Sequence, residues 1–66
     1  MHTTPSPRQL QILQLLANGQ EGKQISRELY ISPSTITTQI HRANQTLGAQ
    51  TRTQAVAIAL RLKLIV

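Results

Sequence analysis

The chain has 66 residues, of which seven are Lys or Arg, two are Asp or Glu and none is Cys. A chain of this length folds as one small domain with a modest core. Without Cys it forms neither disulfides nor a zinc–thiolate site. Its longest apolar stretch, residues 55–60, is far shorter than the roughly 20 residues that cross a membrane, and residues 1–5 lack the pattern of a signal peptide. We therefore expect a cytoplasmic protein.

The net charge of +5 is large for so short a chain. Such an excess is typical of proteins that bind a polyanion. It also keeps a small domain soluble whatever its partner, so charge alone leaves both interpretations open. Leu, Ile and Ala supply most of the apolar side chains and Tyr30 is the only aromatic residue, which favours an all-α fold over a sheet.

The first expected helix follows a polar stretch, residues 1–5, that has no hydrophobic periodicity and is expected to be a disordered tail. Ser6 then begins a helix-opening pattern, because its hydroxyl can cap the first turn while Gln9 completes a capping box. Apolar residues follow at three- and four-residue spacing, namely Leu10, Leu13, Leu16 and Ala17. We expect a helix over residues 7–18 that ends at Gly19.

The next two helices are expected over residues 23–30 and 33–47, with only a short turn between them. In the first of these, Ile25 and Leu29 lie four residues apart on one face. The second opens at Ser32, a natural N-cap, and its apolar residues keep helical spacing: Ile36, Ile40, Ala43 and Leu47. Its abundant Thr residues are mediocre helix formers, which suggests that its outward face serves another purpose.

A fourth helix is expected over residues 52–62, opened by a capping box from Thr51 to Gln54. Its apolar residues fall on two faces. One stripe is expected to face the core and consists of Ala55, Val56, Ala59 and Leu62, while the second, on the far side, consists of Ala57, Leu60 and Leu64. The result is a domain of four helices over residues 6–66.

A short helix, a tight turn and a longer helix form the helix-turn-helix arrangement, here over about residues 22–42, whose second helix enters the DNA major groove. Any small helical bundle also contains two helices and a turn, so this spacing by itself does not distinguish a DNA-binding motif from an ordinary helical bundle.

The chain also resembles the C-terminal DNA-binding domain of LuxR/GerE-type (FixJ/NarL-type) transcription regulators over about residues 6–65. Seven segments in the right order carry the resemblance: SPR (6–8), ILQLLANG (12–19), KQISREL (23–29), IS (31–32), TI (35–36), LGA (47–49) and TRTQAV (51–56). The resemblance implies a four-helix domain that binds double-stranded DNA through its third helix.

Carried over residue by residue, the resemblance implies base contacts from Thr37, Thr38 and His41. Helical spacing independently places these residues opposite the apolar positions of the same helix. The resemblance also implies phosphate contacts from Lys23 and Arg52, and Arg42 is a further candidate. Thr35 is another, because it lies near the N-terminus of the third helix, where backbone N–H groups point outward. The alternative is that these residues are ordinary solvated side chains.

The family pairs through its fourth helix, so the resemblance implies a homodimer. The second apolar stripe gives a physical reason, because a helix that is apolar on two faces needs more than its own core to cover it. We expect the interface to contain Ala57, Leu60, Arg61 and Leu64. The alternative is a core helix with scattered exposed apolar residues.

The chain departs from the family's pattern at several positions. Gln9 and Gln11 stand where acids are common, so neutral hydrogen bonds are expected to replace ionic ties of the first helix. Thr37 and Gln39 stand where basic residues or His are frequent, which lowers the positive charge of the reading face. Tyr30 replaces a small residue in the turn and is expected to lie at the edge of the core.

Two functional hypotheses follow. The first is a DNA-binding transcription regulator, dimeric on DNA and associated with the nucleoid. The second is a small antagonist that pairs through its fourth helix with a full-length LuxR-type regulator and blocks DNA binding. We expect no enzymatic activity, because the chain is too small to enclose a catalytic cavity and Glu21 and Glu28 lie two helical turns apart. No cofactor or metal is implied.

Overall fold

The computed structural model describes residues 4–66 and contains four helices over that range, with no strand. They are α1 (Pro7–Ala17), α2 (Gly22–Leu29), α3 (Pro33–Leu47) and α4 (Arg52–Arg61). The predicted all-α fold is confirmed, and each helix begins and ends within one residue of its expected bounds. Every helix within residues 4–66 is too short or too polar to traverse a lipid bilayer.

The expected N-terminal tail falls partly outside the described residues. Nothing in the structure describes residues 1–3, whereas Thr4 is exposed and Pro5 is buried. Packing against the domain therefore begins at Pro5, one residue before the expected domain boundary.

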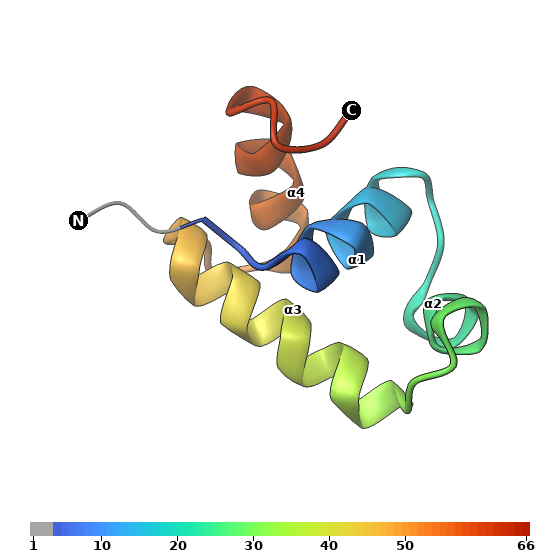
Figure 1. Cartoon of the computed structure of the whole chain (residues 1–66). Helices are drawn as coiled ribbons and strands as arrows, with labels where there is room; N and C mark the ends of the chain where they lie inside the picture. The colour runs from blue at the N-terminus through green and yellow to red at the C-terminus, as the bar shows by residue number, and fades with distance from the viewer. Residues whose placement is uncertain (1–3) are drawn as a thin grey trace.

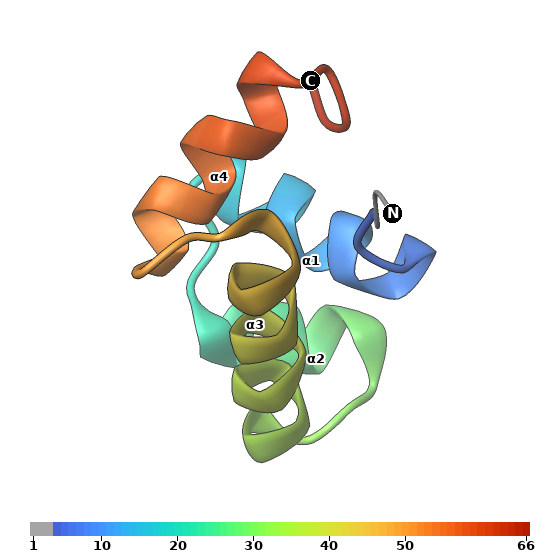
Figure 2. The same ribbon diagram turned by 90° about the vertical axis from the view of Figure 1, so that its left-hand side faces the viewer.

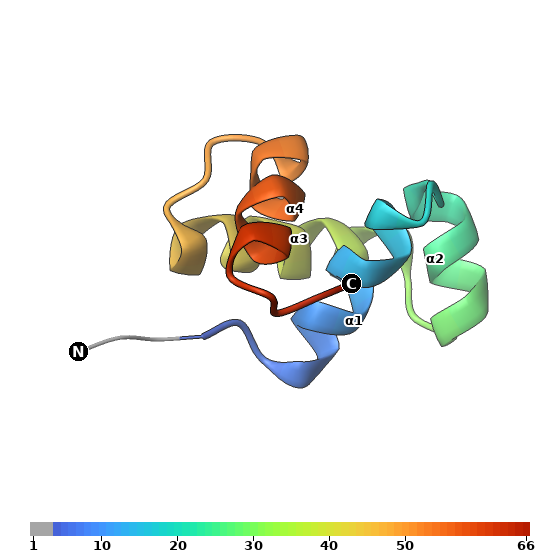
Figure 3. The ribbon, with the colours of Figure 1, turned by 90° about the horizontal axis from the view of Figure 1, so that it is seen from above.

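The longest helix, α3, contacts each of the other three (Figure 1). The short helix α2 lies near the N-terminal end of α3, and only residues 30–32 separate the two. Seen from the side, α4 lies across the opposite end of α3 (Figure 2). The view from above shows α2 and α4 well apart, with α1 between them (Figure 3). Because its neighbours cover only part of its surface, α3 retains one long exposed side.

Side-chain caps fix the starts of three helices at the residues that the sequence predicts. The hydroxyl oxygens of Ser6, Ser32 and Thr51 each accept a hydrogen bond from the backbone N–H three residues later. The Ser6 N–H in turn donates to Gln9 Oε1 at 3.1 Å, which completes the predicted capping box. The predicted capping box at Thr51 is only half formed, because Gln54 Oε1 accepts from the Gln50 N–H at 2.7 Å. Caps of this kind are each worth about 1 kcal/mol, so they define where these short helices begin.

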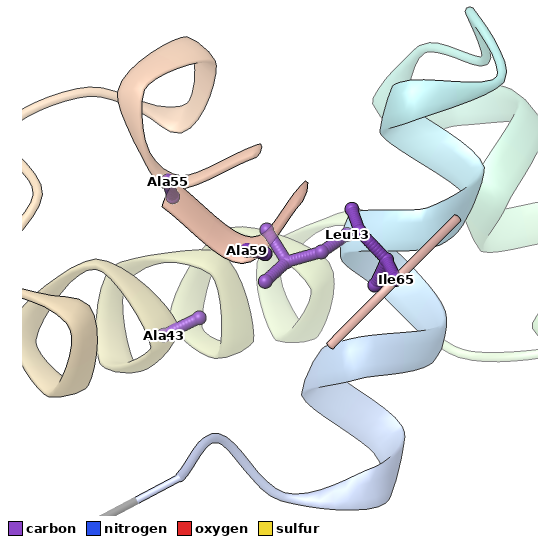
Figure 4. Packing of buried hydrophobic residues seen from close by; sticks show 5 residues of the cluster. All are labelled: Leu13, Ala43, Ala55, Ala59 and Ile65. Carbon is purple, nitrogen blue, oxygen red and sulfur yellow. The ribbon is translucent and has the colours of Figure 1, made fainter. Parts of the chain in front are cut away.

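The core consists of two groups of buried side chains that meet along α1 and α3. The α2-side core contains Ile12, Ile25, Ile36 and Ile40. The α4-side core contains Leu13, Ala43, Ala55, Ala59 and Ile65 (Figure 4). Because α3 contributes to both, its apolar side is held along most of its length.

Each helix ends with a residue in the left-handed conformation just beyond it, namely Gly19, Tyr30, Gly48 and Lys63. In each case the next backbone N–H bonds back to a carbonyl five residues earlier, as in the Schellman motif. The two glycines adopt this conformation without a steric penalty. The other two ends carried no such signal, because Tyr and Lys seldom occupy it.

The interpretation of Tyr30 as a residue at the core edge is wrong, because its side chain is 94% exposed. Its left-handed backbone, with φ of 57°, turns the side chain outward. The following residue, Ile31, packs against the α2-side core instead.

The predicted apolar stripes of the fourth helix are wrong at their C-terminal ends, at Leu62 and Leu64. Because Lys63 reverses the chain with φ of 59°, Leu64 lies beyond α4 and packs against the α4-side core. Leu62, which was expected to face the core, is 52% exposed. The core position is filled by Ile65, and Figure 4 shows its side chain beside Leu13 of α1.

Gln14 holds the returning segment against α1. Its Oε1 accepts from the Val66 N–H at 2.8 Å, and its Nε2 donates to the Val66 carbonyl oxygen at 2.6 Å. The side-chain amide thus pairs with the backbone as a neighbouring strand would, and it keeps Ile65 over a core that is otherwise rich in alanine.

Replacing Ile65 by Ala should lower the free energy of unfolding by about 2 kcal/mol or more, because it opens a cavity among the alanines of the α4-side core. Leu62→Ala is the matched control, and its effect should stay within about 0.5 kcal/mol because the residue is largely exposed. Urea denaturation followed by circular dichroism measures both. Equal losses for the two variants would contradict the reversed C-terminal segment.

Tyr30→Gly should be more stable than Tyr30→Ala by about 1 kcal/mol, because only glycine adopts the left-handed conformation without a steric penalty. Neither substitution removes a buried contact, so the comparison isolates the backbone. Thermal and urea denaturation of the two variants supply the measurement. An alanine variant as stable as the glycine variant would show that the turn is not left-handed in solution.

Candidate nucleic-acid interface

The exposed side of α3 carries the residues that the sequence analysis singled out for base contacts. Thr37, Thr38 and His41 are all exposed, while Ile36 and Ile40 are buried on the opposite side. At 100° per residue, the exposed residues share one side of the helix, which we call the outer face of α3. It consists of Ser34, Thr37, Thr38, His41 and Gln45.

Two hydroxyl groups on the outer face bond back into the helix. Thr37 Oγ1 donates to the Pro33 carbonyl oxygen at 3.1 Å, and Thr38 Oγ1 donates to the Ser34 carbonyl oxygen at 3.0 Å. A carbonyl oxygen carries no hydrogen, so the hydroxyl must be the donor in each pair. Both side chains are therefore held in fixed orientations.

Thr35, a candidate phosphate contact, is exposed in the first turn of α3. Its N–H donates to Ser32 Oγ at 3.2 Å, and its Oγ1 accepts from the same hydroxyl at 2.9 Å. Thr35 Oγ1 lies in the first turn of α3, where the Ser34 N–H has no carbonyl partner within the helix.

A shallow groove separates α3 from the segment that leads into α4. We call it the α3–α4 groove, and its lining residues are Thr37, Ile40, His41, Asn44, Gln50, Thr51 and Arg52. The structure thus brings Arg52 together with Thr37 and His41, although these residues are distant in the sequence.

Two other candidate phosphate contacts lie outside this groove. Arg42 is exposed and follows His41 by 100° around α3, which places it on the opposite flank of the outer face. Lys23 is exposed in the first turn of α2. Positive side chains therefore lie on both flanks of the outer face, with Arg52 on one and Arg42 on the other.

Asn44 is a groove residue that the sequence analysis did not single out. Its Oδ1 is buried without a hydrogen-bond partner. An Asn within a helix is unfavourable for helix formation, and this local cost was the only signal that pointed to it.

A neutral side-chain bond ties α3 to the start of α1. Gln9 Nε2 donates to Gln39 Oε1 at 3.0 Å, while Gln9 Oε1 serves the α1 cap. The bond agrees with the expectation that uncharged hydrogen bonds replace ionic ties of the first helix. It fixes the register of α3 against α1 without placing an acid near the outer face.

The charges of the domain are distributed unevenly. All seven Lys and Arg side chains are exposed. The two acids, Glu21 and Glu28, lie at the two ends of α2, and Glu28 Oε1 accepts from Gln20 Nε2 at 3.1 Å. Neither α3 nor α4 contains an Asp or Glu, so no acidic side chain of these helices offsets the positive charge beside the outer face.

The expected dimer interface is only partly available on α4. Ala57 and Arg61 are exposed, and Leu60 is 44% exposed. Leu64 lies beyond the helix and is half-buried against the α4-side core. The exposed apolar surface of α4 on this side therefore centres on Leu60.

Comparison with known proteins places these features in a family. Residues 4–59 match the family described as "Bacterial regulatory proteins, luxR family". The chain is 44% identical over 54 residues to the uncharacterized transcriptional regulatory protein YxjL of Bacillus subtilis (strain 168), and the match covers 82% of this chain but 25% of YxjL. It is 38% identical over 55 residues to the spore germination protein GerE of the same organism, covering 83% of this chain and 74% of GerE.

Two solved structures share the fold of this chain. A crystal structure of ChrA, the response regulator of a heme-sensing two-component system, superposes with a TM-score of 0.91 at 32% identity, covering 98% of this chain and 32% of that one. The structure of the transcription factor GerE superposes with a TM-score of 0.88 at 36% identity, covering 92% of this chain and 91% of that one.

Proposed function

Because the chain belongs to the luxR family of bacterial regulatory proteins, we propose that it is a transcription regulator that binds double-stranded DNA as a homodimer, with α3 in the major groove. Such a protein acts in the cytoplasm, on the DNA of the nucleoid. The observation that carries the proposal is the outer face of α3, which is polar, free of acids and flanked by exposed arginines.

The shape and charge of this surface suit B-DNA. The major groove is about 12 Å wide and admits an α-helix, and α3 has one side that no other helix covers. Thr37, Thr38 and His41 are then placed to contact base edges. Their apolar counterparts on the opposite side remain in the core, so the helix can enter the groove without disturbing the domain.

Phosphate contacts supply most of the affinity in this arrangement, and they position the helix without reading sequence. We assign them to Arg52 and Arg42 on the two flanks of the outer face, to Thr35 at the start of α3 and to Lys23 of α2. The distribution of charge supports the assignment of Arg52, Arg42 and Thr35, because neither α3 nor α4 contains an acid, whereas Lys23 lies on α2, which has both acids of the chain at its ends.

The proposed dimer uses α4. Leu60 is the centre of its exposed apolar surface, with Ala57 and Arg61 beside it. Leu64 contributes mainly to the core and less to the interface than the sequence suggested. Two copies on DNA place their reading helices in half-sites about one helical turn apart, or a multiple of that distance.

The antagonist hypothesis requires the same α4 surface but no DNA-reading surface on α3. The acid-free outer face of α3 therefore favours DNA binding. Moreover, the matched relatives are named as regulators themselves.

Arg52→Ala should weaken binding by a similar factor for every duplex, because a phosphate contact carries no sequence information. The slope of log affinity against log salt should fall in magnitude by about 1. Lys63→Gln, at the far end of α4, is the control and should leave the slope unchanged. Fluorescence anisotropy on duplexes selected from a random pool measures both. An affinity that does not fall between low and high salt would argue against the DNA-binding function.

Leu60→Asp should abolish pairing on DNA, because it places a charge at the centre of the proposed interface. Affinity for a duplex with two half-sites should fall at least tenfold, while binding to a single half-site persists. Leu62→Asp is the matched control, since Leu62 is similarly exposed but lies outside the interface. Mobility-shift and sedimentation experiments report the number of bound copies. An identical loss for both variants would rule out this surface.

A further inference from the structure

We infer that α3 reads A·T base pairs through Thr37 and Thr38, whose side chains present only hydrogen-bond acceptors and methyl groups to DNA. This inference rests on the proposed DNA-binding function and adds the base preference of its reading surface. It follows from the two hydroxyl bonds within the helix, because they decide which atoms of each threonine remain available.

A free threonine hydroxyl can donate or accept, so by itself it distinguishes bases poorly. Here each hydroxyl hydrogen is already engaged, with the Pro33 carbonyl oxygen at 3.1 Å and the Ser34 carbonyl oxygen at 3.0 Å. The remaining lone pairs of Oγ1 can only accept. The hydrogen bond also fixes the side-chain rotamer, so the methyl group keeps one position on the exposed surface.

The edges of the base pairs in the major groove differ in what they offer such a surface. Guanine presents two acceptors, N7 and O6, which an acceptor oxygen cannot satisfy. Adenine presents its N6 amino group as a donor, and its partner thymine presents a methyl group. Cytosine also offers a donor but has no methyl group. An A·T pair therefore satisfies both Oγ1 and the methyl group, whereas a G·C pair satisfies at most the oxygen.

The rest of the outer face agrees with this preference. Arg and Lys, the commonest readers of guanine, do not occur among its five residues, and Arg42 lies on the flank. Gln45, which does lie on the outer face, belongs to the residue type that pairs with adenine through N6 and N7. The basic side chains nearest the groove are thus placed for phosphates, and the five residues of the face include no Lys, Arg, Asp or Glu.

The test is selection of binding sites from a random duplex pool by the parent chain and by single variants at each threonine. Thr37→Val and Thr38→Val keep the methyl groups and the shape but remove the acceptor oxygen. Thr37→Ser and Thr38→Ser keep the hydroxyl and remove the methyl group. All four substitutions change exposed side chains at two positions on one face, and circular dichroism verifies that each variant is folded.

The parent chain should select A·T pairs at the positions read by Thr37 and Thr38. Each valine variant should show a preference for adenine that is about three- to tenfold weaker at its own position, as expected for the loss of one hydrogen bond to a base edge. Replacing thymine by deoxyuridine in the selected site, which removes only the methyl group, should weaken the parent chain and the valine variants but not the matching serine variant.

The outcomes separate the two proposals. Absence of duplex binding by the folded parent chain would overturn the proposed function and this inference with it. Binding that selects G·C pairs at the positions affected by Thr37 and Thr38 would overturn the inference alone. So would an A·T preference that survives both valine substitutions unchanged.

Discussion

The apolar side of α3 is anchored in both halves of the core, and the rest of the domain depends on this packing. Ile36 and Ile40 belong to the α2-side core, whereas Ala43 belongs to the α4-side core. A helix buried at these positions cannot rotate about its axis without exposing them, at a cost of about 2 kcal/mol for each isoleucine. The same packing therefore fixes which side faces outward. The outer face owes its position to residues that are buried on the opposite side of the helix.

The sequence predicted the fold well wherever local chemistry determines it. Caps at Ser6, Ser32 and Thr51, together with glycines at 19 and 48, located most helix ends to within a residue. The predicted side-chain positions are wrong where a non-glycine residue adopts the left-handed conformation. Helical periodicity extended past Arg61, where α4 ends, places Leu62 in the core and Leu64 on the outer surface, the reverse of what is observed. Ile65 reaches the core only because the chain reverses there, and this long-range contact has no local pattern.

The shared exposed side of Thr37, Thr38 and His41 could be predicted from the sequence, but the contacts of the candidate site could not. Helical spacing showed that Thr37, Thr38 and His41 share a side, and packing of Ile36 and Ile40 agrees. It could not show that Arg52 lies in a groove with Thr37, because that depends on how the segment after Gly48 approaches α3. Nor could it show the direction of the threonine hydroxyls, which is a matter of rotamer choice. The burial of Asn44 Oδ1 likewise depends on neighbours distant in the sequence.

In the proposed DNA complex, the positive side chains and the base-reading side chains occupy different parts of the surface around α3. A basic residue at the centre of the outer face would bind any phosphate backbone and would favour guanine. The arginines instead lie on the flanks, and the centre carries short side chains whose hydroxyls are bonded to the helix backbone. Those bonds also reduce the side-chain entropy still to be lost on binding, since the orientations are fixed beforehand. Under the proposed readout, the poor helix propensity of Thr is offset at these positions, because Thr would offer a fixed acceptor and a methyl group on a helix that is held in place by its opposite side.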